Sequence, residues 1–241
     1  MPGRFLWGPV VMCSPMPEPF VVGVIDSGIH SDHPHIGQTA RGVGFGRDGR
    51  RRDDSMDRLG HGTAVGAAIQ DLMPDVQLCA LKVFDQDYST SVEALVAAIG
   101  WASTHAIPLV NLSLGTKDLS SASMLTDAIA RAHDVGTVIV AAGSSQGVDW
   151  LPGTLCLDGV VRVELDWSYA RGSHAVSVLP GCSVFRTCGY PRSIPGVDRE
   201  RNLKGLSFAV ANITGLAARV MIETGVRGYA PLVEELRQRA S

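Results

Sequence analysis

Four runs of consecutive apolar residues stand out in the first 143 positions of the chain. Between them lie longer segments in which apolar residues recur every three to four positions. An unbroken apolar run is typical of a strand covered on both faces, and the longer period is typical of an amphipathic helix. The predicted strands are residues 20–25, 76–84, 109–115 and 137–143, and the predicted helices are residues 62–72, 91–105 and 121–136. This alternation predicts an α/β fold with a mainly parallel sheet and helices on both faces, and it excludes an all-β barrel.

The pattern is less regular after residue 150. Residues 160–164 and 175–179 are predicted strands, and residues 186–201, rich in proline, glycine and charge, are a predicted loop. Small and apolar residues then continue to Met221 and predict a helix buried on most of its faces. A final amphipathic helix begins near Pro231. Residues 20–241 are therefore expected to form one domain, preceded by an extended, proline-containing arm at residues 1–19.

Three polar residues occupy positions where a fold of this kind can carry chemistry. Asp26 follows the first predicted strand, and ligands of open α/β sheets bind at the carboxyl ends of strands. His61 lies beside glycines at a predicted helix start, and Ser207 follows a glycine turn at another. Free N–H groups and the helix dipole favour negative charge there, which suits a nucleophile that generates an oxyanion. Taken singly, Ser207 also fits an ordinary helix N-cap, and Asp26 an ordinary turn.

The segments that hold these residues resemble the subtilase family, the subtilisin-type serine peptidases. Asp-Ser-Gly at 26–28, Gly-His-Gly-Thr at 60–63 and Gly-Leu-Ser-Phe-Ala at 205–209 match three family signatures in the same order. The resemblance implies a three-layer subtilisin-like fold and a serine endopeptidase. It assigns the catalytic roles to Asp26, His61 and Ser207. The serine segment matches least well, because Leu206 and Ala211 stand where the family usually has threonine and proline.

Two further segments correspond to the substrate-binding and oxyanion regions of subtilases. Asn-Leu-Ser-Leu-Gly at 111–115 resembles the segment whose free edge pairs with an extended peptide. This resemblance assigns substrate binding to Ser113, Leu114 and Gly115. After Ala-Ala-Gly at 141–143, subtilases usually have an asparagine whose amide donates to the oxyanion, and this chain has Ser144.

Ser144 leaves three interpretations of the oxyanion hole open. We expect its hydroxyl to replace the asparagine amide directly, since a hydroxyl can donate one hydrogen bond. In the second interpretation, Ser145 or Gln146 reaches the same point through a shifted loop. In the third, the hole is weak and the enzyme slow, which a processing enzyme with a single substrate would tolerate.

The composition limits which binding partners, cofactors and cellular location can be expected. A net charge of −3 gives no reason to expect nucleic acid or an anionic membrane as a partner, and no stretch is predicted to span a membrane. The five cysteines are irregularly spaced, so reduced thiols in a cytoplasmic protein are expected, with a Cys182–Cys188 bridge as the alternative. Cysteines and histidines lack metal-ligand spacing, and the connection after residue 72 is too short for the calcium loop that many subtilases have there. No metal or other cofactor is expected.

The sequence thus predicts a specialised intracellular serine endopeptidase, and maturation of a peptide precursor by leader removal is one hypothesis for its role. Only 25 residues precede Asp26, so we expect no signal or long pro-segment. The arm at residues 1–19 is expected to pack on the surface or, alternatively, to lie near the cleft and restrain activity. The charged loop at residues 42–59 is expected to be solvated, with Asp54 or Asp57 facing a basic substrate side chain as the alternative. The alternative function is a catalytically weak or inactive subtilase-fold module that binds peptides.

Overall fold

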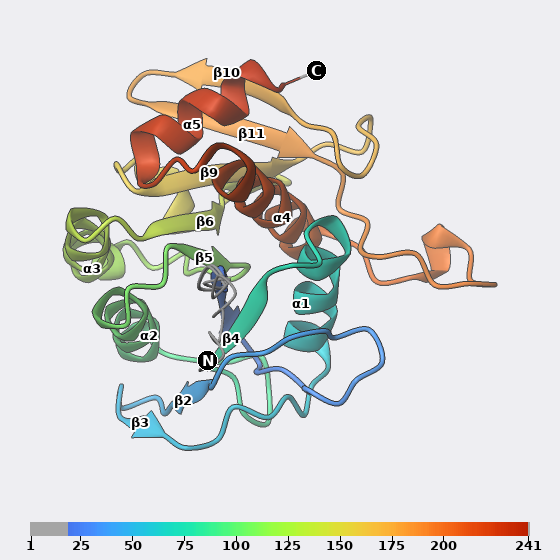
Figure 1. Ribbon diagram of the computed structural model, residues 1–241. Coiled ribbons are helices and arrows are strands. Elements are labelled where there is room, and N and C mark those ends of the chain that lie inside the picture. The colour runs from blue at the N-terminus through green and yellow to red at the C-terminus, as the bar shows by residue number, and fades with distance from the viewer. Residues whose placement is uncertain (1–18, 241) are drawn as a thin grey trace, which may run out of the picture.

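The computed structural model describes residues 19–240 (Figure 1). Its main sheet contains β1 (Val21–Asp26), β2 (Val43–Phe45), β3 (Arg51–Arg52), β4 (Gln77–Lys82), β5 (Leu109–Leu112), β6 (Val138–Ala142), β9 (Val160–Leu165), β10 (Ala175–Leu179) and β11 (Cys182–Thr187). The strand order is β10-β11-β9-β6-β5-β1-β4-β2-β3. Only the outermost pairs, β10 with β11 and β2 with β3, are antiparallel. A separate hairpin consists of β7 (Ser144–Ser145) and β8 (Val148–Asp149).

Within residues 19–240, five α-helices cover the two faces of the sheet. Helices α1 (His61–Leu72), α4 (Leu206–Thr224) and α5 (Tyr229–Gln238) lie on one face. Helices α2 (Val92–Thr104) and α3 (Ala122–Asp134) lie on the other (Figure 1). Three short 3₁₀ helices span Leu119–Ser121, Gly153–Leu155 and Arg199–Arg201. The predicted α/β fold, a mainly parallel sheet between two helical layers, is confirmed.

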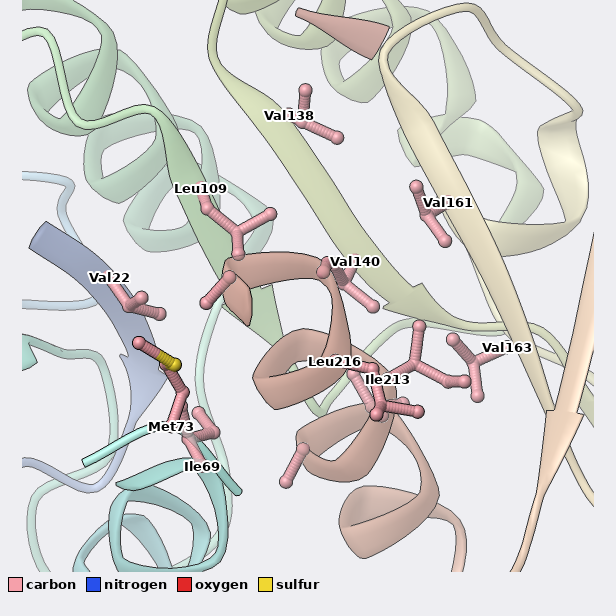
Figure 2. Close-up of a cluster of buried hydrophobic side chains, with 14 of the residues drawn as sticks. Val22, Ile69, Met73, Leu109, Val138, Val140, Val161, Val163, Ile213 and Leu216 are labelled. Atoms are coloured by element: carbon pink, nitrogen blue, oxygen red, sulfur yellow. The ribbon is translucent and has the colours of Figure 1, made fainter. Parts of the chain in front are cut away.

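The central strands read as continuous apolar runs because both of their faces are buried. On β6, Val138 and Val140 point into the cluster beneath α1 and α4 (Figure 2), whereas Ile139 points into the cluster beneath α2 and α3. This is the two-residue alternation of a strand, with apolar contacts on each side. Full burial of such a side chain contributes about 1.5–3 kcal/mol, so the two clusters hold the strand ends in fixed relative positions.

The structure contains strands that the sequence pattern did not predict. Strands β2 and β3 lie inside the segment that was expected to be a polar loop, and Arg51 and Arg52 on β3 are exposed. Strand β11 was missed because polar residues interrupt its apolar pattern, although it pairs in parallel with β9. Pairing with a neighbour, rather than local hydrophobicity, therefore defines the edges of this sheet.

The prediction that all cysteines are reduced is wrong for two of them. Cys156 and Cys182 form a disulfide between Cα atoms 5.2 Å apart, within the usual range for such bonds. The alternative partner, Cys188, is a free and buried thiol, as is Cys79. The predicted cytoplasmic location thus loses the support of uniformly reduced thiols, because disulfides persist mainly in oxidising compartments.

Helix α4 is the one described helix that is long and apolar enough to match a membrane span. Its most apolar window is 72% buried inside the fold, however, as expected for the core helix of a globular domain. The arm predicted at residues 1–19 lies, apart from its last residue, outside the described part of the chain.

Candidate active site

Asp26 ends β1 at the point where the sheet topology reverses. Strand β1 pairs with β4 on one side and with β5 on the other. Helices α1 and α2, which follow β1 and β4 in the chain, lie on opposite faces of the sheet. A crevice opens at the carboxyl ends of the strands at such a switch point, which is where α/β proteins bind their ligands. The side chain of Asp26 is buried at this edge.

His61 contacts Asp26 across the first helix start. Its Nδ1 atom lies 2.8 Å from Oδ1 and 2.9 Å from Oδ2 of Asp26. The side chain of His61 is 25% exposed, so its ring extends from the buried carboxylate to the surface of a cleft. Burial opposes protonation, but the hydrogen bond to Asp26 and its negative charge outweigh burial and raise the pKa of His61 above 6.5. Asp26 is thus placed to orient the ring and to stabilise its charged form.

Ser207 reaches the same cleft from the first turn of α4. Gly205 precedes the helix with a φ of 146°, a conformation that favours glycine, and its N–H donates to the carbonyl of Gly189. The Ser207 hydroxyl donates to the carbonyl oxygen of Ser113 over 3.2 Å. The Ser113 hydroxyl in turn donates to the Ser207 carbonyl oxygen over 3.1 Å, which fixes the start of α4 against the end of β5.

A single cleft of about 1070 Å³ brings together most of the predicted site residues. His61 and Ser207 line it together with Ser113, Leu114 and Gly115, which follow β5. Thr116, one residue further, exchanges backbone hydrogen bonds with Leu151. The predicted peptide-binding segment therefore borders the cleft and is anchored at its far end.

Comparison with known proteins assigns the family. Residues 18–164 match the model of the subtilase family. The chain is 29% identical over 220 residues to subtilisin DY of Bacillus licheniformis, covering 83% of this chain and 76% of that protein. It is 30% identical to a thermostable alkaline protease of Halalkalibacterium halodurans, over 83% of this chain.

The chain belongs to the subtilase family. It is therefore classed with the subtilisin-like serine endopeptidases, which are hydrolases. The solved structure of the nisin leader peptidase of Lactococcus lactis superimposes with a TM-score of 0.68 at 19% identity, covering 90% of this chain and 81% of that one. This likeness concerns the fold. Relative to the curated proteins, the chain spans 76% of subtilisin DY but only 56% of the alkaline protease.

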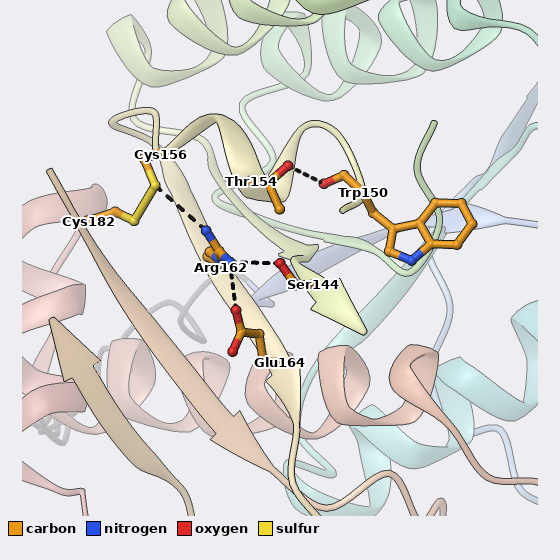
Figure 3. The surroundings of a disulfide bond; sticks show 7 residues. All are labelled: Ser144, Trp150, Thr154, Cys156, Arg162, Glu164 and Cys182. Carbon is orange, nitrogen blue, oxygen red and sulfur yellow. Dashed lines mark hydrogen bonds and ion pairs between the residues drawn. A yellow bond between two sulfur atoms is a disulfide. The ribbon is translucent and has the colours of Figure 1, made fainter. Parts of the chain in front are cut away.

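The structure does not bring the Ser144 side chain of this subtilase to the cleft. The Ser144 hydroxyl donates to the carboxylate of Asp149 and accepts a 2.9 Å hydrogen bond from Nη2 of Arg162 (Figure 3). Ser145 and Gln146 line the cleft in its place. This placement differs from the predicted oxyanion role. The reason is Arg162, a mostly buried cation on β9 that no local pattern connects to residue 144.

Asp57 has a structural role that the sequence analysis did not assign. Its carboxylate accepts hydrogen bonds from the N–H groups of Leu59, Gly60 and Thr63 and from the Thr63 hydroxyl. Burial alone would raise its pKa, but these hydrogen bonds outweigh burial and lower it below 3.8. Asp57 therefore holds the turn that presents His61. The available signal was a carboxylate shortly before a helix start.

The alternative in which Asp54 or Asp57 faces a basic substrate side chain is not supported by their contacts. Asp57 is buried in the turn before α1, and Asp54 forms ion pairs with Lys82 and Arg58. Neither residue lines the cleft that contains Ser207.

The raised pKa of His61 predicts a specific pH dependence. If His61 is the general base, it must be neutral to accept a proton, so kcat/KM is expected to fall as pH decreases through a midpoint above 6.5. Asp26→Asn should move this midpoint to lower pH, because the stabilising charge is removed, and should lower kcat by about 10⁴-fold. A pH profile of kcat/KM tests this. Asp127→Asn, on the exposed face of α3, is the control. An unchanged midpoint in Asp26→Asn would contradict the assignment of the fall in kcat/KM at low pH to His61 and Asp26.

Proposed function

We propose that this subtilase is a serine endopeptidase that cleaves peptide bonds through Asp26, His61 and Ser207. The observation that carries the proposal is the contact of His61 Nδ1 with both oxygens of the buried Asp26, made in a cleft that His61 shares with Ser207. The acid, the base and the nucleophile come from three separate elements, β1, α1 and α4. Such convergence on one cleft supports a catalytic role over three independent structural roles.

The chemistry is acyl transfer. Ser207 Oγ attacks the peptide carbonyl while Nε2 of His61 accepts the hydroxyl proton, and Asp26 stabilises the imidazolium ion without taking a proton. The oxyanion is stabilised in part by the N–H of Ser207, which lies in the first turn of α4 and has no acceptor within the helix. His61 then returns the proton to the leaving amine. Water attacks the acyl-enzyme with His61 as the base, which regenerates Ser207.

The contacts of Ser207 support a role for Ser113 in the first step of this reaction. The Ser207 hydroxyl donates to the carbonyl of Ser113 rather than to His61. An extended peptide that pairs with residues 113–115 would offer its own N–H groups to this segment. A substrate N–H on the Ser113 carbonyl would release the Ser207 hydroxyl, which could then turn to His61.

The decisive experiment is intact-mass analysis after treatment with a serine-directed fluorophosphonate. One adduct is expected on the native chain and none on Ser207→Ala or His61→Ala. A folded native chain that binds peptides in the cleft but takes up no reagent would favour the alternative function, a catalytically weak or inactive peptide-binding module. The engaged side chain of Ser144 is the observation that keeps this alternative open.

We also propose that the substrate is a particular peptide precursor rather than unfolded protein in general. The likeness in fold to the nisin leader peptidase supports a processing role. Cleavage of a peptide library, read by mass spectrometry, is expected to give a restricted set of sites. Degradation of several unrelated unfolded proteins at the rate of the best library peptide would contradict this role and leave the peptidase assignment intact.

A further inference from the structure

The segment after β6 forms a tight hairpin whose two faces carry different side chains. Ser144 pairs with Asp149 and Ser145 pairs with Val148. The turn between them contains Gln146 with a φ of 50° and Gly147 with a φ of 75°, the positive values that a two-residue hairpin turn requires. Successive side chains of a strand point to opposite faces, so the Ser144–Asp149 pair and the Ser145–Val148 pair lie on opposite sides of the hairpin.

The face that carries Ser144 is held by a buried ion network. Arg162 donates to Ser144 and forms an ion pair of 2.6 Å with Glu164 (Figure 3). The second carboxylate oxygen of Glu164 binds Arg186 at 2.7 Å. The side chains of Arg162 and Glu164 are only 11% and 15% exposed. Turning the Ser144 hydroxyl toward the cleft would break its hydrogen bonds to the guanidinium of Arg162 and to Asp149. This is costly, because a buried charged group left without a hydrogen-bond partner costs more free energy than a neutral one.

The opposite face borders the cleft. Ser145 and Val148 line it together with His61 and Ser207. Within residues 19–240, the Ser145 hydroxyl has no hydrogen-bond partner, so it is available to a ligand. The alternation of the hairpin thus places a free hydroxyl in the cleft one residue after the position at which subtilases usually have their asparagine.

We propose that the Ser145 hydroxyl is the side-chain donor to the oxyanion and that Arg162 is a positioning residue. This inference rests on the proposed peptidase function. Ser145 donates a hydrogen bond to the developing negative oxygen and transfers no proton, while the N–H of Ser207 supplies the second donor. Arg162 acts at a distance: by holding Ser144 it keeps the hairpin face with Ser145 toward Ser207.

The test compares single variants of the full chain with the same peptide substrate. Ser145→Ala is expected to lower kcat by about 10²–10³-fold with little change in KM, the effect of losing one oxyanion donor in subtilisin. Ser145→Thr keeps a hydroxyl and should recover most of kcat. Gln146→Ala should cost much less than Ser145→Ala. Ser144→Ala removes the contact through which Arg162 acts, so it should lower kcat by about as much as Arg162→Met and by less than Ser145→Ala. A larger loss in Gln146→Ala or Ser144→Ala than in Ser145→Ala, or an unchanged kcat in Ser145→Ala, would overturn the assignment.

The role of Arg162 is tested by its coupling to Ser145. Arg162→Met should lower kcat in the native background but have little further effect in Ser145→Ala, because the donor that it positions is already gone. Equal fold losses in both backgrounds would contradict the positioning role, and circular dichroism checks that each variant is folded. If the native chain neither labels with fluorophosphonate nor turns over, the proposed function itself fails. If the native chain is labelled and turns over substrate, and Ser145→Ala has the same kcat, only the oxyanion role of Ser145 fails.

Discussion

Replacement of Ser207 by alanine is expected to lower kcat by about 10⁶-fold, the size of the effect in subtilisin. The loss is large because, in the proposed mechanism, Ser207 forms the covalent bond and the neighbouring side chains cannot substitute for it. His61→Ala should cost about the same, since without a base the hydroxyl is a weak nucleophile. Steady-state turnover of a fluorogenic peptide measures both.

The double variant provides the sharper test of whether the two residues act as a unit. When nucleophile and base serve a single step, removing the second after the first costs little more. Ser207→Ala/His61→Ala should therefore be no slower than either single variant by more than a few-fold. If the two losses multiplied instead, His61 would be acting outside the Ser207 reaction and the proposed mechanism would be wrong.

Gly62→Ala is expected to damage both stability and activity, although it adds only one methyl group. A Cβ at position 62 would lie 2.2 Å from the carbonyl oxygen of Gly28 and 3.2 Å from the Cβ of Asp26. Helix α1 must therefore move away from the turn after β1, at a cost of about 1–3 kcal/mol in the free energy of unfolding. The same movement separates His61 from Asp26, and a shift of about 1 Å costs about 10²-fold in rate. Urea denaturation and kcat/KM measure the two effects.

Gly100→Ala is the matched control for this substitution. Gly100 also lies in a helix, in the interior of α2, and nothing is within 4 Å of an added Cβ there. Alanine should raise the free energy of unfolding by about 0.5–1 kcal/mol through helix propensity and leave kcat unchanged. If Gly62→Ala were as stable as Gly100→Ala, close packing would not explain the glycine beside His61.

The parts of the site that the sequence predicted are those set by contacts near in the chain or by strict local requirements. Asp26 ends an apolar run that both faces of a sheet bury. Gly205 has a backbone conformation that favours glycine before α4. Gly62 leaves room for the carbonyl oxygen of Gly28, which explains the glycine directly after His61. Each feature can be recognised from the sequence, because only certain residue types satisfy it.

The parts that sequence analysis misplaced depend on which strands become neighbours. Cys182 bonds to Cys156, 26 residues away, rather than to the nearer Cys188, because β9 and β11 pair in register and bring the ends of two loops together. Ser144 meets Arg162 because β6 and β9 are adjacent in the sheet. Neither pairing has a signal in local hydrophobicity or spacing.

The sequence by itself thus determined the fold class and the subtilase signatures, and it singled out Asp26, His61 and Ser207 as the residues on which the proposed function rests. Apolar periodicity and glycine geometry are properties of short segments, so they can be recognised without coordinates. The tertiary structure decided which way each polar side chain faces. In the structure, Ser144 binds Arg162, Ser145 lines the cleft, and Asp57 holds the turn before His61 through hydrogen bonds. Those choices follow from the register of distant strands and from the need to pair buried charges, which only the assembled fold fixes.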